Sequence, residues 1–134
     1  MNTIRQNISS GTRWEVEVGY SRAVRIDNLI EVAGTTATDE NGQTVAPGNP
    51  YAQTRYALAK IEIALRAVGA TMNDVIRTRM YVTDIKQWEQ YGRAHGEVFK
   101  DIRPAATMVE VRALISPDLM VEIEVTAIVS EHAQ

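Results

Sequence analysis

The order of apolar and polar positions along the chain predicts a succession of strands and helices. Apolar residues recur at helical spacing over about 51–68 and again from Ile85 to Phe99. Short apolar runs indicate strands over 23–26 and 29–33. Strict alternation indicates half-buried strands over four further segments, 14–18, 76–83, 106–113 and 120–129. The predicted order is three strands, a helix, a strand, a helix and two strands, which is an α+β arrangement.

The first predicted helix has signals at both of its ends. Asn49 is a typical N-cap, Pro50 suits the first helical position, and Gly69 can end the helix. In the second helix, Gly92 and Gly96 are four residues apart and therefore lie on one face. Each costs about 1 kcal/mol of helix propensity relative to alanine, so their presence needs a reason. Close packing onto the sheet is one reason, and room for a ligand is the other.

Two helices can cover only one face of such a sheet. If residues 116–118 form a simple hairpin turn, the mixed faces of the last two strands lie on the same, uncovered side. These faces combine methionine and isoleucine with the charged residues Glu110, Arg112, Glu122 and Glu124. A half-apolar face of this kind usually finds a partner. We therefore expect a homo-oligomer that packs through it.

Composition narrows the possible classes of protein. A length of 134 residues fits a single domain over 1–134. The formal charge of −3 argues against a protein that mainly holds nucleic-acid backbone. The absence of cysteine excludes a disulfide, a thiol nucleophile and a cysteine metal site. With only His95 and His132 as imidazoles, we expect neither a metal site within one subunit nor a cofactor.

Two further features of the sequence concern location and anion binding. No apolar run approaches the roughly 18 residues of a membrane helix, and residues 1–10 lack the apolar core of a secretory signal. We therefore expect a soluble, cytoplasmic protein with no membrane partner. Lys60, Lys86 and Lys100 are the only lysines among 14 basic residues. The excess of arginine is explained either by anion recognition or by genome base composition.

The carboxylates of the last strand are the main candidates for chemistry. Glu122 and Glu124 are two residues apart and so project from one side of the strand. Partial removal from water raises the pKa of a carboxyl group, which can then act as a general acid or base near neutral pH. The alternative is structural, with Arg112 pairing with either glutamate across the predicted hairpin. Spacing alone favours that alternative, and His95 is interpreted as a packed core histidine.

A more specific pattern lies in the C-terminal part of the chain. Residues 103–111 read Arg-Pro-Ala-Ala-Thr-Met-Val-Glu-Val, and residues 121–124 read Val-Glu-Ile-Glu. Together they resemble the signature of the RidA/YjgF family. The likeness extends over nearly the whole domain, through Gly19-Tyr20, Val32-Ala33-Gly34, Val82-Thr83-Asp84 and the order of elements.

The resemblance implies a fold, an assembly and an activity. In this family the fold is similar to chorismate mutase of the bacillus type, and three subunits pack their mixed sheets into a central barrel with the helices outside. Ligands bind in clefts between subunits, where reactive enamines or imines are hydrolysed to ammonia and a 2-keto acid. By this resemblance, Glu122 activates the hydrolytic water, Tyr20 lines the cleft, and the backbone of Gly34 lies beside the ligand.

The chain departs from the family pattern at one important position. Active deaminases of the family follow Pro-Ala with an arginine that clamps the substrate carboxylate. Here that residue is Ala106, which implies a branch without the clamp. Arg103, Arg22 and Arg112 are candidate replacement anchors, and Arg103, Ala106 and Glu124 are included among the expected substrate-binding residues. The family asparagine on the second helix is also missing, since Gly92 or Arg93 falls there.

Three functions are compatible with the sequence. The first is hydrolysis of an imine, an enamine or a related substrate other than the usual 2-amino-acid imines. The second is non-catalytic ligand binding or a chaperone-like role in the same clefts. The third is the ribonuclease activity sometimes ascribed to the family, against which the acidic charge and the lack of a basic stripe weigh.

Overall fold

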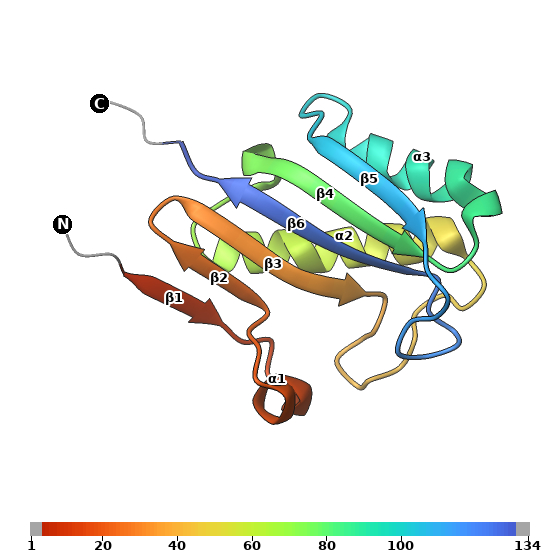
Figure 1. The fold of residues 1–134 in the computed structure, drawn as a ribbon, viewed down its shortest axis with the longest axis horizontal. Coiled ribbons are helices and arrows are strands. Elements are labelled where there is room, and N and C mark those ends of the chain that lie inside the picture. The colour runs from red at the N-terminus through yellow and green to blue at the C-terminus, as the bar shows by residue number, and fades with distance from the viewer. Residues whose placement is uncertain (1–3, 131–134) are drawn as a thin grey trace.

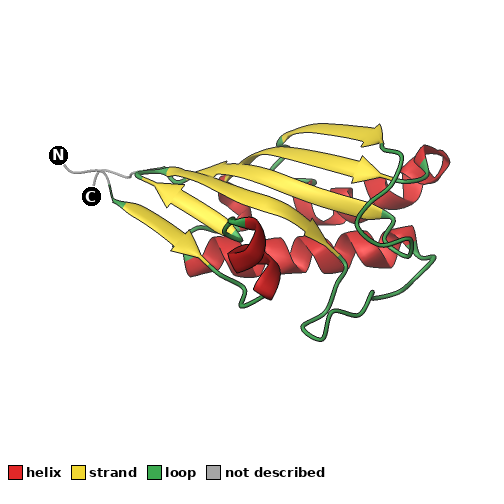
Figure 2. Ribbon diagram, turned by 60° about the horizontal axis from the view of Figure 1, so that its bottom comes forward, coloured by secondary structure: helices red, strands yellow, loops and turns green. Residues whose placement is uncertain are grey.

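A six-stranded mixed sheet forms the centre of the computed structural model, which describes residues 4–130 (Figure 1). Two long helices, α2 and α3, pack on one face of this sheet (Figure 2). The elements in chain order are β1 (Arg5–Ile8), α1 (Arg13–Val18), β2 (Ala23–Ile26), β3 (Leu29–Thr36), α2 (Pro50–Ala67), β4 (Val75–Val82), α3 (Trp88–Phe99), β5 (Ala105–Glu110) and β6 (Val121–Ile128). Single 3₁₀ turns precede β4 and α3, at Met72–Asp74 and Ile85–Gln87.

The strands lie in the order β1-β2-β3-β6-β4-β5. All neighbours are antiparallel except β4 and β5, which run parallel and are joined by a crossover through α3. Parallel neighbours need such a long connection, and α3 provides it. The α+β class with two helices on one face is therefore confirmed.

The hairpin predicted between the last two strands is wrong. β5 joins the outer edge of β4, whereas β6 inserts between β3 and β4 in the middle of the sheet. Alternation predicts which residues share a face of one strand, but it does not say which strands are neighbours. As a result, Ala106 and Glu110 are level with the inward-facing Thr78 and Val82, while Glu122 is on the opposite face.

The strand predicted over residues 14–18 is also wrong, because this segment forms the short helix α1. The buried carboxylate of Glu15 accepts hydrogen bonds from the backbone N–H and the hydroxyl of Ser10, which ties the helix to the preceding loop. Gly19 ends the helix with a φ of 89°, a conformation that favours glycine. The strand at this edge is instead β1, which the sequence pattern did not predict.

Helix α2 has the predicted ends. The side chain of Asn49 accepts a hydrogen bond of 3.0 Å from the N–H of Ala52, and Pro50 is in the first turn. On its inner face, α2 packs apolar side chains against α3 and the sheet. The fully buried residues of this core include Ile30, Leu58, Ile61, Leu65, Tyr91, Phe99 and Ile123.

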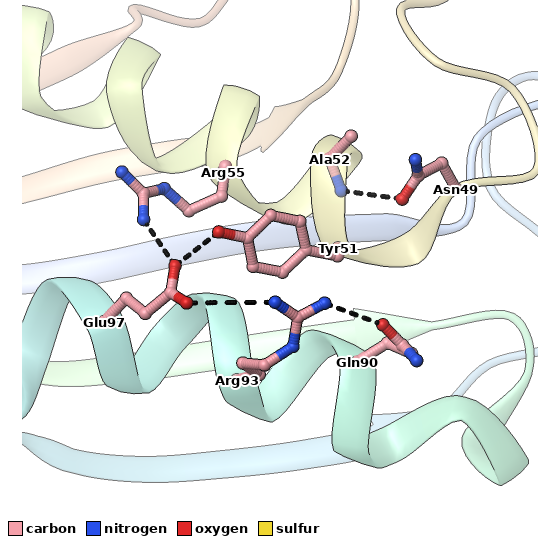
Figure 3. A network of polar contacts seen from close by, with 7 residues as sticks. All are labelled: Asn49, Tyr51, Ala52, Arg55, Gln90, Arg93 and Glu97. Carbon is pink, nitrogen blue, oxygen red and sulfur yellow. Dashed lines mark hydrogen bonds and ion pairs between the residues drawn. The ribbon is translucent and has the colours of Figure 1, made fainter.

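A polar network joins α2 to α3 on the exposed side of this pair (Figure 3). Glu97 accepts hydrogen bonds from the hydroxyl of Tyr51 and from Arg55, the latter at 2.7 Å. Arg93 lies 3.9 Å from Glu97 and stacks over the Tyr51 ring at 3.9 Å from its centroid. These contacts fix the two helices relative to each other at the surface.

The face of the sheet opposite α2 and α3 carries no long helix among the described residues (Figure 2). Leu29, Ile76, Val109 and Ile128 are 42–47% exposed on the strands of the sheet. Charged side chains, including Arg79 and Glu124, accompany them. The expectation of a half-apolar, uncovered face is met within one subunit. No helix in the described part of the chain is long and apolar enough to cross a membrane.

Candidate functional site

Glu122 lies on the uncovered face of β6, directly against Gly34 of β3. Strand β3 has an irregularity in its pairing between Val32 and Thr35, and Gly34 falls within it. A Cβ atom built on Gly34 would lie 2.0 Å from Oε2 and 2.9 Å from Cδ of Glu122. Real Cβ atoms do not approach other atoms so closely, so the carboxylate occupies space that only glycine leaves open.

The surroundings of Glu122 favour acid–base behaviour. The side chain is half-buried, and burial raises the pKa of its carboxyl group. The positive charge of Arg22 lowers that pKa, and the negative charge of Glu124 raises it again. The net effect is upward, which brings the pKa closer to neutral pH and makes both protonation states more accessible there.

Glu124 has partners that the sequence did not predict. The hydroxyl of Tyr81 donates a hydrogen bond of 2.8 Å to its carboxylate, and Arg79 lies 3.8 Å away. The hydrogen bond to Glu124, together with burial, raises the pKa of Tyr81. The predicted pairing with Arg112 is wrong, because Arg112 follows the edge strand β5 and is exposed. The signal that could have found Arg79 and Tyr81 was their alternation on the predicted strand over 76–83.

Tyr20 lies beside a hollow of about 700 Å³ on the uncovered face. Its walls come from β1, from the loop after α1, from β3 and from the centre of the sheet, where Arg79 and Glu124 lie. Ala33, the neighbour of Gly34, also lines it, whereas Gly34 and Glu122 themselves are not among the residues that line it. The guanidinium of Arg22 lies 5.6 Å from the centroid of the Tyr20 ring. Tyr20 and Glu124 thus line this hollow, Glu122 projects from the same side of β6 as Glu124, and Gly34 contacts Glu122.

Ala106 and Arg103 do not join this group within one subunit. Ala106 is exposed on the edge strand β5, level with Thr78 on the helix side of the sheet. Arg103 adopts a left-handed backbone with a φ of 56°, and its Nε donates to the carbonyl of Lys100 at 3.2 Å. Its backbone N–H donates to the carbonyl of Phe99. Arg103 thus closes the end of α3.

Among the remaining candidates from the sequence, His95 is packed into the subunit as a structural residue. His95 bonds Thr78 through its Nε2 at 2.9 Å and packs on the Phe99 ring, and burial lowers its pKa. His132 lies outside the described residues. No cluster of potential metal ligands occurs within residues 4–130. The close-packing explanation for Gly92 and Gly96 is wrong for the described part of the chain, since a Cβ on either would meet no atom of residues 4–130 within 4 Å.

Comparison with known proteins agrees with the residue pattern and the fold. The family model described as Endoribonuclease L-PSP matches residues 11–129. The chain belongs to the RidA/YjgF family. This confirms the resemblance carried by residues 103–111 and 121–124.

Several relatives of this RidA/YjgF protein are similar along most of their length. An uncharacterised protein of Streptomyces coelicolor is 34% identical over 122 residues, which cover 91% of this chain and 90% of that one. The 3-aminoacrylate deaminase RutC of Acinetobacter baylyi is 33% identical over 104 residues, 78% of this chain and 82% of RutC. A Mycobacterium tuberculosis member of the YjgF/YER057c/UK114 family has a crystal structure that matches with a TM-score of 0.85 and 52% identity, covering 94% of this chain and all of that one.

Proposed function

We propose that this Rid protein binds a small molecule in clefts between subunits and hydrolyses an imine- or enamine-type substrate. The observation that carries this proposal is the half-buried Glu122 carboxylate, which is seated against Gly34 and has a raised pKa. In the reaction, Glu122 takes a proton from water while the water oxygen attacks the imine carbon. The proton then passes to the nitrogen to give a carbinolamine. Glu122 next moves the proton of the carbinolamine hydroxyl to the nitrogen as the carbon–nitrogen bond breaks, which gives a carbonyl product and ammonia.

We further propose a homotrimer of single-domain subunits, located in the cytoplasm. The exposed apolar side chains of the uncovered sheet face support assembly, because a patch of this kind is unfavourable in water. Arg103 and Ala106 lie away from Glu122 in one subunit, so they could line the same cleft only if a neighbouring subunit contributes them. The mass of the protein in solution tests this assembly, and a stable monomer would contradict it.

The proposed substrate is not one of the usual 2-amino-acid imines. An arginine at position 106 would clamp a carboxylate through charge-assisted hydrogen bonds worth about 1.5–3 kcal/mol each. Ala106 can supply none of them. We therefore expect slow release of ammonia from freshly generated 2-aminoacrylate, and a clear gain from the variant Ala106→Arg. Wild-type turnover equal to that of an arginine-containing relative would contradict this reasoning.

A panel of unstable imines and enamines tests the proposed activity itself. It should include 3-aminoacrylate, because RutC of Acinetobacter baylyi is a deaminase of that compound. Ammonia release is compared between wild type, Glu122→Ala and the control Glu62→Gln, which changes an exposed carboxylate on α2. Activity that Glu122→Ala abolishes and Glu62→Gln leaves unchanged supports the proposal.

The second candidate function is ligand binding without catalysis, which the missing clamp at Ala106 favours. It would be distinguished by ligands that protect the protein against thermal unfolding but are not converted. Ribonuclease activity is a more distant alternative, suggested by the description of the family model alone. Cleavage of RNA that Glu122→Ala leaves unchanged would contradict the assignment of Glu122 as the centre of chemistry.

A further inference from the structure

Arg22 hydrogen-bonds three consecutive residues of β3, among them Gly34 of the candidate site. It precedes β2, and its Nη1 donates to the carbonyl of Gly34 at 2.8 Å and to the hydroxyl of Thr35 at 2.9 Å. A longer contact of 3.4 Å reaches the carbonyl of Ala33. Its backbone is held as well, since its N–H donates to Ile8 and its carbonyl accepts from Ala33. Both the main chain and the side chain of Arg22 are thus fixed against the irregular part of β3.

Arg22 supplies hydrogen-bond donors to backbone carbonyls in the irregular part of β3. Where strand pairing is irregular, backbone carbonyls lose partners in the ladder, and buried carbonyls need donors. A neutral donor such as an amide could provide a hydrogen bond to Gly34. Arginine adds a positive charge, and this charge acts on the Glu122 carboxylate that lies against Gly34. No direct ion pair joins the two residues in the described part of the chain, so the charge acts through space.

We propose that Arg22 is a positioning residue for Glu122, which fixes the Gly34 backbone behind the carboxylate and stabilises the carboxylate with its charge. The inference rests on the proposed function, in which Glu122 must accept a proton from water. The same guanidinium also lies over the ring of Tyr20.

Other charges face this part of the site and must be separated from the effect of Arg22. Glu124 lies on the same strand, and Tyr81 is paired with Glu122 on β4. Lys60 approaches from α2, where its Nζ donates to the carbonyls of Thr36 and Thr38 at 3.0 and 2.8 Å. Burial lowers the pKa of Lys60, and the Arg22 charge lowers it further. The residues that carry these groups are the same in wild type and in the Arg22 variants, so a difference between the titrations reports the change at position 22.

Two substitutions separate the roles of hydrogen bonding and charge. Arg22→Gln retains a donor for Gly34 but removes the charge, and Arg22→Lys retains the charge but removes the planar guanidinium. Arg25→Gln is the matched control. Arg25 also donates to backbone carbonyls, those of Asp27 and Val68, and it pairs in register with the inward-facing Ile30.

The primary measurement is the titration of the Glu122 carboxyl by NMR, in intact protein labelled with ¹³C at the glutamate carboxyl. The Glu122→Gln variant identifies the resonance. We expect Arg22→Gln to raise the pKa of Glu122, and Arg22→Lys and Arg25→Gln to leave it near the wild-type value. A titration in Arg22→Gln that superimposes on wild type would overturn the inference. A clear rise above the wild-type pKa in Arg22→Lys, which keeps the charge, would also overturn it, and this comparison with wild type can be made even if Arg22→Gln does not fold.

A kinetic measurement complements the titration wherever a substrate is known. At neutral pH we expect Arg22→Gln to lower kcat more than tenfold and to move the acid limb of the pH–rate profile upward. Arg22→Lys should keep the limb in place. If wild type hydrolyses no imine, the proposed function fails, whereas the NMR titration still decides whether Arg22 controls Glu122.

Discussion

Adding one methyl group at Gly34 should lower the catalytic activity of the protein while leaving its stability almost unchanged. In Gly34→Ala, the new Cβ would lie 2.0 Å from Oε2 of Glu122 and 3.1 Å from its Cγ. Gly34 is not among the residues with positive φ, so its backbone conformation is open to alanine. The conflict is therefore confined to one side chain, and that side chain is the proposed acid–base group.

The size of the effect follows from the contact distances. Ordinary van der Waals contact begins near 3.4 Å, so Oε2 must retreat by about 1.4 Å. The carboxylate is the far end of a flexible side chain and can move at small cost, so we expect the free energy of unfolding to change by less than ~1 kcal/mol. A displacement of about 1 Å from the reacting geometry can lower a rate by ~10²-fold. We therefore expect kcat to fall about a hundredfold in a protein that is still folded.

A double-mutant cycle provides the assay and its internal control. Ammonia release and urea unfolding are measured for wild type, Gly34→Ala, Glu122→Gln and the double variant. Once Glu122 has lost its acid–base group, the methyl group at position 34 should cause no further loss of activity. Additive losses, or wild-type activity in Gly34→Ala, would refute the claim that Gly34 acts by making room for the Glu122 carboxylate.

Three further predictions concern stability. Burial raises the pKa of Glu122, so protonation of its carboxyl group stabilises the fold. This contribution is present below the ordinary pKa and is lost as the pH rises through the raised value. Glu122→Gln should therefore unfold at higher urea than wild type at pH 7, but not below pH 4. Gly96→Ala should stabilise α3 by about 1 kcal/mol in thermal unfolding, since its methyl group meets no atom of the described residues within 4 Å, and a lower Tm would mean that a partner or ligand fills this space. Ile61→Ala should lower the free energy of unfolding by about 2–5 kcal/mol, because Ile61 is fully buried between α2 and the sheet, and a smaller loss would place it outside the core.

Local sequence signals predicted local structure well. Helix α2 was correctly placed because Asn49 and Pro50 act within one turn of the chain. The hairpin at residues 116–118 failed because alternation records faces and not neighbours, and β6 pairs instead with β3 and β4. The alternation of Trp14 and Val16 was misleading for another reason. These side chains are exposed on a short helix that is held by the polar contacts of Glu15.

The candidate site shows the same division between local and long-range information. The family resemblance singled out Glu122 and Gly34, but not that the two are in contact, since they lie on different strands far apart in sequence. Arg22 was one of three equivalent candidates for an anion anchor. Only the structure sets Arg22 apart from the other two, because the irregular pairing of β3 leaves the Gly34 carbonyl as a partner for its side chain. The hydrogen bonds from Lys60 to carbonyls at the end of β3 and just beyond it also had no signal in the sequence.

The turnover number of Glu122→Gln tests the central claim most directly. Glutamine keeps the size of the side chain and the space beside Gly34 but can neither take up nor release a proton at neutral pH. On the best imine substrate of wild type, we predict a fall in kcat of about 10²–10⁴-fold, the range expected for loss of general acid–base catalysis, with ligand affinity changed only a few-fold. A variant that keeps the wild-type kcat would contradict the assignment of Glu122 as the acid–base group.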